Sequence, residues 1–363
     1  MVRWTKPPAL RPGDRVRVVA PATVVDPAEL RPGLEGLRSL GLQVEVASHC
    51  YDQWGLFAGR DESRAADLEQ AWLDPGVRAV IAAKGGYGCM RLLPLLSWSK
   101  LRVVPPKVLL GFSDVTALHL AWGRHLQVVT FHGPMPSVDP EQGWSPAQLR
   151  GLQEVLFGQR PVSGAVHTLP TPYLPGQPVY AGEPSRDDAG EPATAWLWQN
   201  PPGQPAPTYW QLPAGGWQAT GGRVGGRLLG GNLSLLAALT GTEYLQHLFV
   251  EPFVLFIEDV DEAPYRLDRM LTQLELAGVL ARAAGFVVGE FTHCEPKPPA
   301  VPGAPAWTWL DVVRERLCRF GQPVLGGVAA GHGDARPTFP LGVEVYLDPQ
   351  GLWFVEPGTS PRS

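Results

Sequence analysis

The chain has 363 residues, of which 44% are hydrophobic and 18% are charged, and its formal net charge is −5. This mild acidity excludes a general electrostatic grip on nucleic acid, which requires a strongly basic surface. No CxxC pair occurs, so neither a zinc ribbon nor a disulfide scaffold is indicated. The N-terminus lacks a signal-peptide core and no apolar run reaches membrane-spanning length, so we expect a cytoplasmic protein that has no membrane partner.

The first 135 residues alternate between strand and helix patterns. Runs rich in β-branched residues predict strands at 15–21, 43–47, 79–83, 107–110 and 128–131. Apolar residues at helical spacing predict helices at 28–40, 61–73 and 116–125, with a further helix from about residue 90. Strands that alternate with helices form a parallel sheet covered on both faces, so an α/β domain is expected over residues 1–135.

Residues 136–224 differ in composition from the segments on either side. Ten prolines fall between residues 170 and 207, and Trp196 and Trp198 lie among them. One interpretation is an irregular connection with short strands. The other is a lid or binding loop whose tryptophans contact substrate.

A second α/β domain is predicted over residues 225–363. Its expected strands are 253–257 and 285–289, its expected helices are 265–276 and 311–320, and a closing hairpin is expected from 343–347 and 352–355.

Ser113 stands between a predicted strand that ends at Gly111 and a helix that begins near Thr116. Such a turn exposes a hydroxyl and directs the N–H groups of a helix start to the same point, as a nucleophile with an oxyanion site requires. The residues Asp114-Val115 depart from the GxSxG pattern of other nucleophilic serines. Because Ser and Asp are both preferred helix N-caps, a capping role for Ser113 or Asp114 is the alternative.

The glycine-rich stretch Lys84-Gly85-Gly86-Tyr87-Gly88 follows the strand predicted at 79–83. Glycines at the carboxyl end of a strand permit positive φ and close backbone approach, and their N–H groups can surround an anion. The spacing matches neither a dinucleotide-binding fingerprint nor a Walker loop. A tight structural turn is the alternative.

Two further candidates lie in the second predicted domain. Glu258 opens an acidic run after the apolar strand 253–257, and α/β folds present active groups at that end of a buried strand. Only the first carboxylate of this run needs to point into a site, and Asp261 and Glu262 are expected to face solvent. His332 lies in the glycine-flanked stretch GHGD at 331–334, where an imidazole can serve as a general base.

Taken in order along the chain, these segments resemble the LD-carboxypeptidase family of serine peptidases, which also contains the microcin C self-immunity peptidases. The matching segments include LRPGDRVRVVAPA at 10–22, FAGRDESRAADL at 57–68, KGGYGCMRLLP at 84–94, GFSDVTALHL at 111–120, GGRLLGGNLSLLAALTGT at 226–242, FIEDVDEAPYRLDRMLTQL at 256–274 and GHGDARPTFPLG at 331–342. Together they run through nearly the whole chain.

The resemblance implies a two-domain α/β architecture. An N-terminal doubly wound, flavodoxin-like parallel sheet and a C-terminal α/β domain would have the active site in the cleft between them. The family pattern assigns Ser113 as the nucleophile, His332 as the general base and Glu258 as the partner of the histidine. It assigns the backbone N–H groups of Gly86 and Asp114 to the oxyanion site. It implies a cytoplasmic homodimer that needs neither a metal nor an organic cofactor.

The implied reaction is hydrolysis of the terminal amide bond of a short peptide. The substrate would be an L,D-linked murein tetrapeptide or a peptidyl or aminoacyl conjugate of a nucleotide. Lys84 and Tyr87 are candidate substrate contacts, as are Trp196 and Trp198 of the proline-rich segment. Lys84 stands where the family usually has arginine, and a lysine loses the planar fork that grips a carboxylate. The alternative function is a non-catalytic protein that binds a small anion or peptide at Gly85–Gly88.

Overall fold

The computed structural model describes residues 4–158, 179–180, 196–198, 208–210, 224–246, 249, 251–297, 306–348 and 351–362. The chain forms two compact units. The first comprises residues 1–160, 336–342 and 357–363, and the second comprises residues 161–335 and 343–356.

The first unit contains a six-stranded sheet in the order β2-β1-β3-β4-β5-β13. Its strands are β1 (Arg15–Val19), β2 (Gln43–Val46), β3 (Val77–Ala82), β4 (Val108–Gly111), β5 (Thr130–His132) and β13 (Phe339–Leu341). Strands β1 to β5 are parallel, and β13 pairs antiparallel with β5. The order 2-1-3-4-5 is that of doubly wound, flavodoxin-like sheets, in which the chain reverses its direction of winding between β1 and β3. The fold predicted for the N-terminal domain is confirmed.

Helices connect these strands. They are α1 (Pro27–Ser39), α2 (Asp61–Leu73), α3 (Cys89–Leu92), η1 (Leu93–Leu95), α4 (Trp98–Leu101), η2 (Ser113–Val115), α5 (Thr116–Leu126) and α6 (Pro146–Leu156). Along β1, Val16 and Val18 are fully buried and alternate with Arg15 and Arg17. This period-2 alternation assigns the valines to the core of the unit and the arginines to the other face of the strand.

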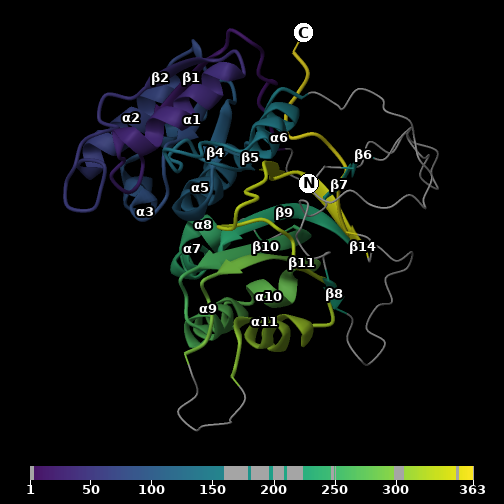
Figure 1. Cartoon of the computed structure of the whole chain (residues 1–363). Coiled ribbons are helices and arrows are strands. Elements are labelled where there is room, and N and C mark those ends of the chain that lie inside the picture. The colour runs from purple at the N-terminus through teal and green to yellow at the C-terminus, as the bar shows by residue number, and fades with distance from the viewer. Residues whose placement is uncertain are drawn as a thin grey trace, which may run out of the picture. The chain divides into compact units, whose positions relative to one another are not determined.

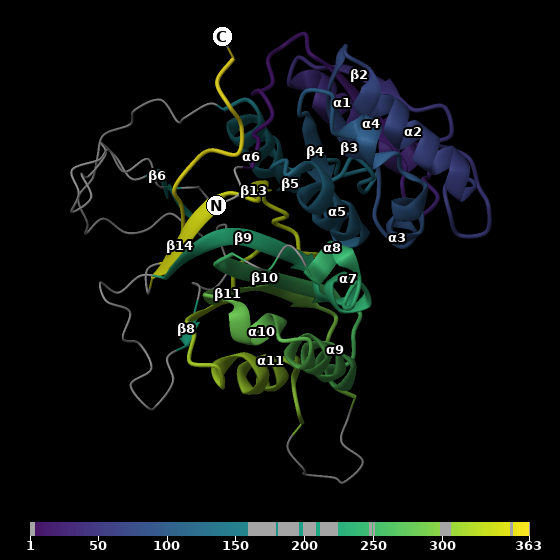
Figure 2. The ribbon, with the colours of Figure 1, turned by 180° about the vertical axis from the view of Figure 1, so that it is seen from behind.

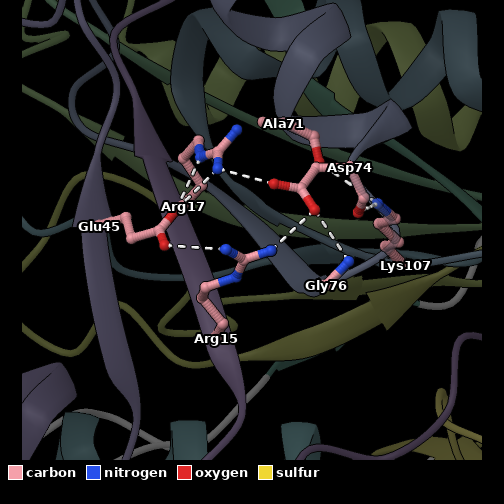
Figure 3. Close-up of polar contacts among 7 residues, drawn as sticks. All are labelled: Arg15, Arg17, Glu45, Ala71, Asp74, Gly76 and Lys107. Carbon is pink, nitrogen blue, oxygen red and sulfur yellow. Dashed lines mark hydrogen bonds and ion pairs between the residues drawn. The ribbon is translucent and has the colours of Figure 1, made fainter.

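The arginines of β1 belong to an ion-pair cluster at the amino end of the sheet (Figure 3). Arg15 and Arg17 both pair with Glu45 of β2 and with Asp74, which precedes β3, at N–O distances between 2.7 and 3.2 Å. Lys107, directly before β4, donates to the main-chain carbonyl of Asp74. Burial lowers the pKa of Lys107 to about 8. Each charge drawn in the cluster has a partner, so this end of the sheet is closed by polar contacts within the protein.

The second unit contains a sheet in the order β6-β7-β15-β14-β9-β10-β11-β12-β8. Its strands are β6 (Val179–Tyr180), β7 (Trp196–Trp198), β8 (Thr208–Trp210), β9 (Val224–Asn232), β10 (Phe253–Val260), β11 (Gly285–Thr292), β12 (Val324–Gly326), β14 (Glu344–Asp348) and β15 (Gly351–Phe354). Strands β9 to β12 are parallel, and β14 and β15 form the predicted closing hairpin. The central strand β10 is buried from Phe253 to Asp259, as a strand covered on both faces should be.

The helices of the second unit are α7 (Leu233–Ala238), α8 (Glu243–Gln246), α9 (Pro264–Leu276), α10 (Val279–Arg282) and α11 (Trp309–Cys318). Figures 1 and 2 show α9, α10 and α11 together on one face of β9, β10 and β11. Nowhere in the described residues of either unit is there a helix of the length and apolarity needed to span a membrane.

Elements that the sequence-based prediction did not contain include α6 and β13. Residues 146–156 form α6 inside the segment that the sequence assigned to an irregular connection or a loop. Ser145 and Gln148 make a reciprocal capping box at its start, and Pro146 occupies the first turn, so the start signal was present in the sequence. Strand β13 joins the first sheet although it comes late in the chain. Its central residue, Pro340, lacks an N–H donor and suits an edge strand.

Candidate active site

The site residues predicted in the first unit lie at the carboxyl ends of its parallel strands. In doubly wound sheets, ligands bind beyond the carboxyl ends of the strands, where the winding reverses. Here that point lies between β1 and β3. Thr23 follows β1, the glycine-rich turn 84–88 follows β3, and Ser113 follows the neighbouring strand β4.

Ser113 occupies the sharp turn that joins β4 to α5. Its φ of +62° lies in the left-handed region, which costs a residue with a Cβ about 1–2 kcal/mol. The turn is held by its neighbours: a Cβ on Gly111 would lie 2.8 Å from Val115, and Nε2 of His119 bonds the Gly111 carbonyl at 2.9 Å. Burial lowers the pKa of His119 to about 4, so its neutral ring donates this bond. A strained serine on a fixed strand-to-helix turn is the geometry of a nucleophile elbow.

The glycine-rich turn lies against Ser113. A Cβ on Gly85 would lie only 3.0 Å from the Cβ of Ser113, so a glycine is needed for this close approach. Gly86 has a φ of +102°, and a Cβ there would overlap the hydroxyl of Thr23. Thr23 holds the turn twice: its N–H donates to the Gly85 carbonyl at 3.3 Å, and its hydroxyl accepts the N–H of Tyr87 at 3.0 Å.

Asp114 ties the same turn to the segment that carries Ser113. Its carboxylate is 1% exposed and accepts the N–H of Cys89 at 2.7 Å as well as that of Gly88, and burial raises its pKa. The N–H groups of residues 87, 88 and 89 are thereby engaged, whereas the N–H of Gly86 makes no hydrogen bond to the described residues. The N–H of Asp114 itself lies in the first turn of η2, where N–H groups lack an intrahelical partner. These two N–H groups are the ones predicted as oxyanion donors.

Lys84 and Tyr87 differ in their contacts: the side chain of Lys84 is held in an ion pair, whereas that of Tyr87 is largely exposed. The Lys84 ammonium pairs with a carboxylate oxygen of Glu29 at 2.7 Å, and the Ser137 hydroxyl donates to the same oxygen at 2.7 Å. These two bonds, that of Lys84 above all, lower the pKa of Glu29. Tyr87 is 49% exposed, and its ring centroid lies 5.7 Å from that of Phe57. Of the two candidate contacts, Tyr87 is the more open to a ligand.

Glu258 lies near the carboxyl end of β10 in the second unit and is 0% exposed. The pairing register with β11 shifts between Ile257 and Asp259, where Glu258 stands. Two glycines make room for it: a Cβ on Gly289 would lie 3.2 Å from its Cβ, and a Cβ on Gly331 would lie 3.0 Å from its Oε2. Burial of a carboxylate is unfavourable unless the group is paired and hydrogen-bonded.

His332 supplies that partner. Its Nδ1 lies 2.7 Å from Oε2 of Glu258, although the two residues are 74 positions apart in the chain. An ionised carboxylate can only accept, so Nδ1 carries the hydrogen and Nε2 is left as the basic nitrogen of the ring. The second oxygen of Glu258, Oε1, is buried and accepts no hydrogen bond from the described residues. The structure thus brings together the two site residues that the sequence predicted in the second domain.

Asp259 is a buried neighbour that the sequence did not single out. It accepts hydrogen bonds from the side chain of Asn232 at 2.9 Å, from the N–H and hydroxyl of Ser234 at 2.9 and 2.7 Å, and from the N–H of Val260 at 2.9 Å. These contacts tie the end of β10 to the start of α7, and burial raises the pKa of Asp259 to about 6. In this run of acidic residues, the only sequence signal that separates Glu258 from Asp259 is the alternation of side chains between the two faces of a strand.

The remaining predicted residues are placed as follows. Ser113 belongs to the first unit, whereas Glu258 and His332 belong to the second. Trp196 and Trp198 lie in β7, which pairs antiparallel with β15, and their side chains lie outside the described residues. Among the described His, Cys, Asp and Glu residues, no group of three or more is arranged to hold a metal ion.

Comparison with known proteins assigns both parts of the chain to one family. Residues 16–133 match the model of the LD-carboxypeptidase N-terminal domain, and residues 225–347 match the model of the LD-carboxypeptidase C-terminal domain. The chain belongs to the LD-carboxypeptidase family. The matched family and its relatives named as carboxypeptidases make it a serine-type carboxypeptidase.

Individual relatives support the same assignment. A probable murein peptide carboxypeptidase of Bacillus subtilis is 33% identical over 343 residues, which are 94% of this chain and 91% of that protein. The crystal structure of muramoyltetrapeptide carboxypeptidase from Oxalobacter formigenes is similar with a TM-score of 0.69 and 26% identity, over 96% of this chain and 100% of that one. A microcin C7 self-immunity protein in complex with aspartyl sulfamoyl adenosine has a TM-score of 0.72 over 98% and 100% of the two chains. At 22% identity, that last likeness shows the fold alone.

Proposed function

We propose that this LD-carboxypeptidase hydrolyses the terminal amide bond of a murein tetrapeptide through a triad of Ser113, His332 and Glu258. The observation that carries the proposal is the buried Glu258, whose Oε2 lies 2.7 Å from Nδ1 of His332. The left-handed conformation of Ser113 beside the glycine-rich turn supplies a matching nucleophile. The triad requires the Ser113 hydroxyl of one unit to reach the imidazole of the other.

In this mechanism, Nε2 of His332 takes the proton of the Ser113 hydroxyl as the oxygen attacks the carbonyl carbon of the terminal amide. Glu258 holds the ring in the tautomer with hydrogen on Nδ1 and stabilises the imidazolium that forms. The N–H groups of Gly86 and Asp114 bind the oxyanion of the tetrahedral intermediate, and each such donor contributes about 3–4 kcal/mol in comparable sites. The imidazolium then protonates the leaving amine, and water hydrolyses the acyl-enzyme.

The choice of a murein substrate follows from the named relatives. The Bacillus subtilis relative is a probable murein peptide carboxypeptidase, and a relative from Pseudomonas aeruginosa, 29% identical over 340 residues, is a murein tetrapeptide carboxypeptidase. For this chain, the corresponding reaction removes the terminal D-alanine from an L,D-linked tetrapeptide.

A direct test is to incubate the full chain with murein tetrapeptide and follow the loss of one alanine residue by mass spectrometry. We expect wild-type protein to release alanine and Ser113→Ala to release no detectable alanine over the same time. Glu262→Gln is a suitable control, because its carboxylate pairs with Arg266 and is placed outside the triad. Alanine release by Ser113→Ala, or none by the wild type, would refute the proposal.

A second candidate substrate is an aminoacyl or peptidyl conjugate of a nucleotide. It is favoured by the fold shared with the microcin C7 self-immunity protein that binds aspartyl sulfamoyl adenosine. Indole rings stack on nucleobases for about 1–3 kcal/mol. If Trp196 or Trp198 serves this purpose, its alanine variant should raise KM for an aminoacyl sulfamoyl adenosine by about 5- to 150-fold and leave KM for murein peptide unchanged. Equal losses on both substrates, with a lowered melting temperature, would remove the tryptophans from the binding site.

We also propose, from the family resemblance, that the protein is a homodimer in the cytoplasm. Light scattering, measured as the full chain elutes from a size-exclusion column, gives its mass in solution. A mass near twice 39.3 kDa supports the dimer, and a mass near 39.3 kDa contradicts it. Cell fractionation with a tagged chain tests the location.

A further inference from the structure

The loop that carries His332 rests on a second glutamate, Glu290, which takes no part in the triad. The main-chain N–H of Glu290 donates to the carbonyl of Ala330 at 2.9 Å. Its side-chain Oε2 accepts the N–H of Gly333 at 3.0 Å. One residue of β11 therefore holds the chain on both sides of His332, two positions before it and one position after it.

The glycines beside His332 show how closely this loop fits. A Cβ on Gly333 would overlap the carboxylate of Glu290, and a Cβ on Gly289 would overlap the carbonyl of Ala330. Gly331 has a φ of +145°, and a Cβ there would lie 3.3 Å from the main-chain oxygen of Glu290. The loop has no room to move toward β11, and the two hydrogen bonds oppose movement away from it.

We propose that Glu290 is a positioning residue of this carboxypeptidase: it fixes the loop 330–333 so that His332 stays within hydrogen-bond distance of Glu258. This inference rests on the proposed function, because the position of His332 matters only if the histidine acts. A misplacement of about 1 Å in a catalytic group can cost on the order of 10²-fold in rate. Glu258 orients the ring directly, whereas Glu290 orients the backbone that carries the ring.

The contact of Glu290 with Gly333 needs an acceptor oxygen in the right place, and a glutamine amide also provides one. Glu290→Ala removes the acceptor, and Glu290→Gln keeps it. Glu295 lies beyond the end of β11 and is exposed, so Glu295→Ala is a matched loss of a carboxylate that does not touch the loop.

We expect Glu290→Ala to lower kcat on murein tetrapeptide by about 10- to 100-fold with KM unchanged, while Glu290→Gln retains most of the activity and Glu295→Ala all of it. Hydrogen exchange of the Gly333 amide, measured by NMR on the full chain, should become faster in Glu290→Ala and stay slow in Glu290→Gln. A residue that served stability alone would lower the melting temperature and leave kcat at 25 °C and the exchange of Gly333 unchanged.

Gly333→Ala gives a second approach that leaves Glu290 in place. Its Cβ would displace the carboxylate, so this variant should lose activity as Glu290→Ala does. In the double variant Glu290→Ala/Gly333→Ala the overlap is removed, so the two losses should not add. Additive losses, or a Glu290→Ala variant with wild-type kcat and wild-type exchange at Gly333, would overturn the proposal.

The test separates this inference from the proposed function. If the wild type releases no terminal residue from murein peptides, the proposed function fails. The positioning of His332 is then decided by the exchange of the Gly333 amide and of the His332 Nδ1 proton. Faster exchange of both in Glu290→Ala supports it, and unchanged exchange of either overturns it.

Discussion

At the amino ends of the strands in the first sheet, Arg15 and Arg17 each pair with two carboxylates in a closed cluster (Figure 3). At the carboxyl ends of the same sheet, Ser113 holds a left-handed conformation, and the N–H of Gly86 makes no hydrogen bond to the described residues. The same strands form both ends of the sheet, so the pairing of the strands does not explain why the two ends differ. Natural proteins break local rules chiefly at functional sites, and the strained Ser113 stands at the carboxyl end.

Two aspartates of the first unit show the same contrast in their charge. Asp74, in the cluster, accepts the N–H of Gly76 and faces both arginines, and these contacts lower its pKa. Asp114, beside Ser113, accepts the N–H groups of Cys89 and Gly88 and lies within reach of the charge of Arg64, but its burial outweighs these contacts and raises its pKa. The cluster stabilises an ionised carboxylate, and the site disfavours one.

The largest effect should come from Ser113. Ser113→Ala should lower kcat by about 10⁶-fold, because it removes the nucleophile, and the double variant with His332→Ala should be hardly slower. Ser113→Gly should be equally inactive but more stable than Ser113→Ala by about 1 kcal/mol, because glycine adopts a positive φ without strain. Calorimetry and alanine release measure the two effects separately. Equal melting temperatures for the two variants would contradict the strain at this turn.

The next effect separates two adjacent carboxylates of the second unit. Glu258→Gln should lower kcat by about 10⁴-fold with a small change in KM, because an amide favours the wrong tautomer of His332. The sequence pattern alone predicts that Asp259→Asn behaves like wild type. The structure changes that expectation. In Asp259→Asn an amide nitrogen replaces one of the two carboxylate oxygens, and it cannot accept the hydrogen bonds that this oxygen now accepts. The loss should cost about 1–3 kcal/mol of stability.

The pH dependence of stability tests the role of Asp259 further. Its pKa in the folded chain is raised to about 6, so its contribution to stability is greatest below the unfolded value and is lost as the pH rises through about 6. Asp259→Asn should abolish that component of the pH profile. A profile identical to that of the wild type would show that Asp259 is not the group responsible.

A smaller effect is expected at Thr23, which holds the glycine-rich turn. Thr23→Val keeps the shape of the side chain but removes the acceptor for the N–H of Tyr87, so the turn that presents the Gly86 N–H loosens. We expect kcat to fall by about 10-fold, less than the 10²- to 10³-fold typical of an oxyanion donor removed outright. Thr23→Ser keeps the hydroxyl and serves as the control. A Thr23→Ser variant as slow as Thr23→Val would assign the effect to packing.

Much of the fold was predictable because its local signals agree. The helix 61–73 was predicted with the bounds that the structure shows, since acidic residues in its first turn precede apolar residues at helical spacing. The N-terminal strands were found to within a few residues. The place of β13 in the first sheet was not predictable, because no local pattern indicates with which distant strand a three-residue segment will pair.

The candidate site also has residues that the sequence could predict and residues that it could not. Motif spacing singled out Ser113, Glu258 and His332, because each stands at a strand end or in a glycine-flanked loop. The groups beside them were not found: Thr23 and Glu290 each make one main-chain and one side-chain hydrogen bond to a loop distant in the sequence, and such bonds leave no periodic trace. Contacts that join distant segments needed the structure.

The smallest predicted effect tests the two aspartates against each other. Asp74→Asn should lose about 1 kcal/mol of stability at pH 7 with unchanged kcat, because the cluster lies at the end of the sheet away from Ser113. The folded-state pKa of Asp74 is lowered, so its contribution is present above the unfolded value and disappears as the pH falls through the folded value. For Asp114 the folded-state pKa is raised, so the sign reverses and its contribution is lost as the pH rises. Stability measured from pH 3 to pH 8 should therefore show the deficit of Asp74→Asn shrinking toward acid and that of Asp114→Asn shrinking toward neutral pH. Slopes of the same sign would mean that the two ends of the sheet do not differ in how they hold charge.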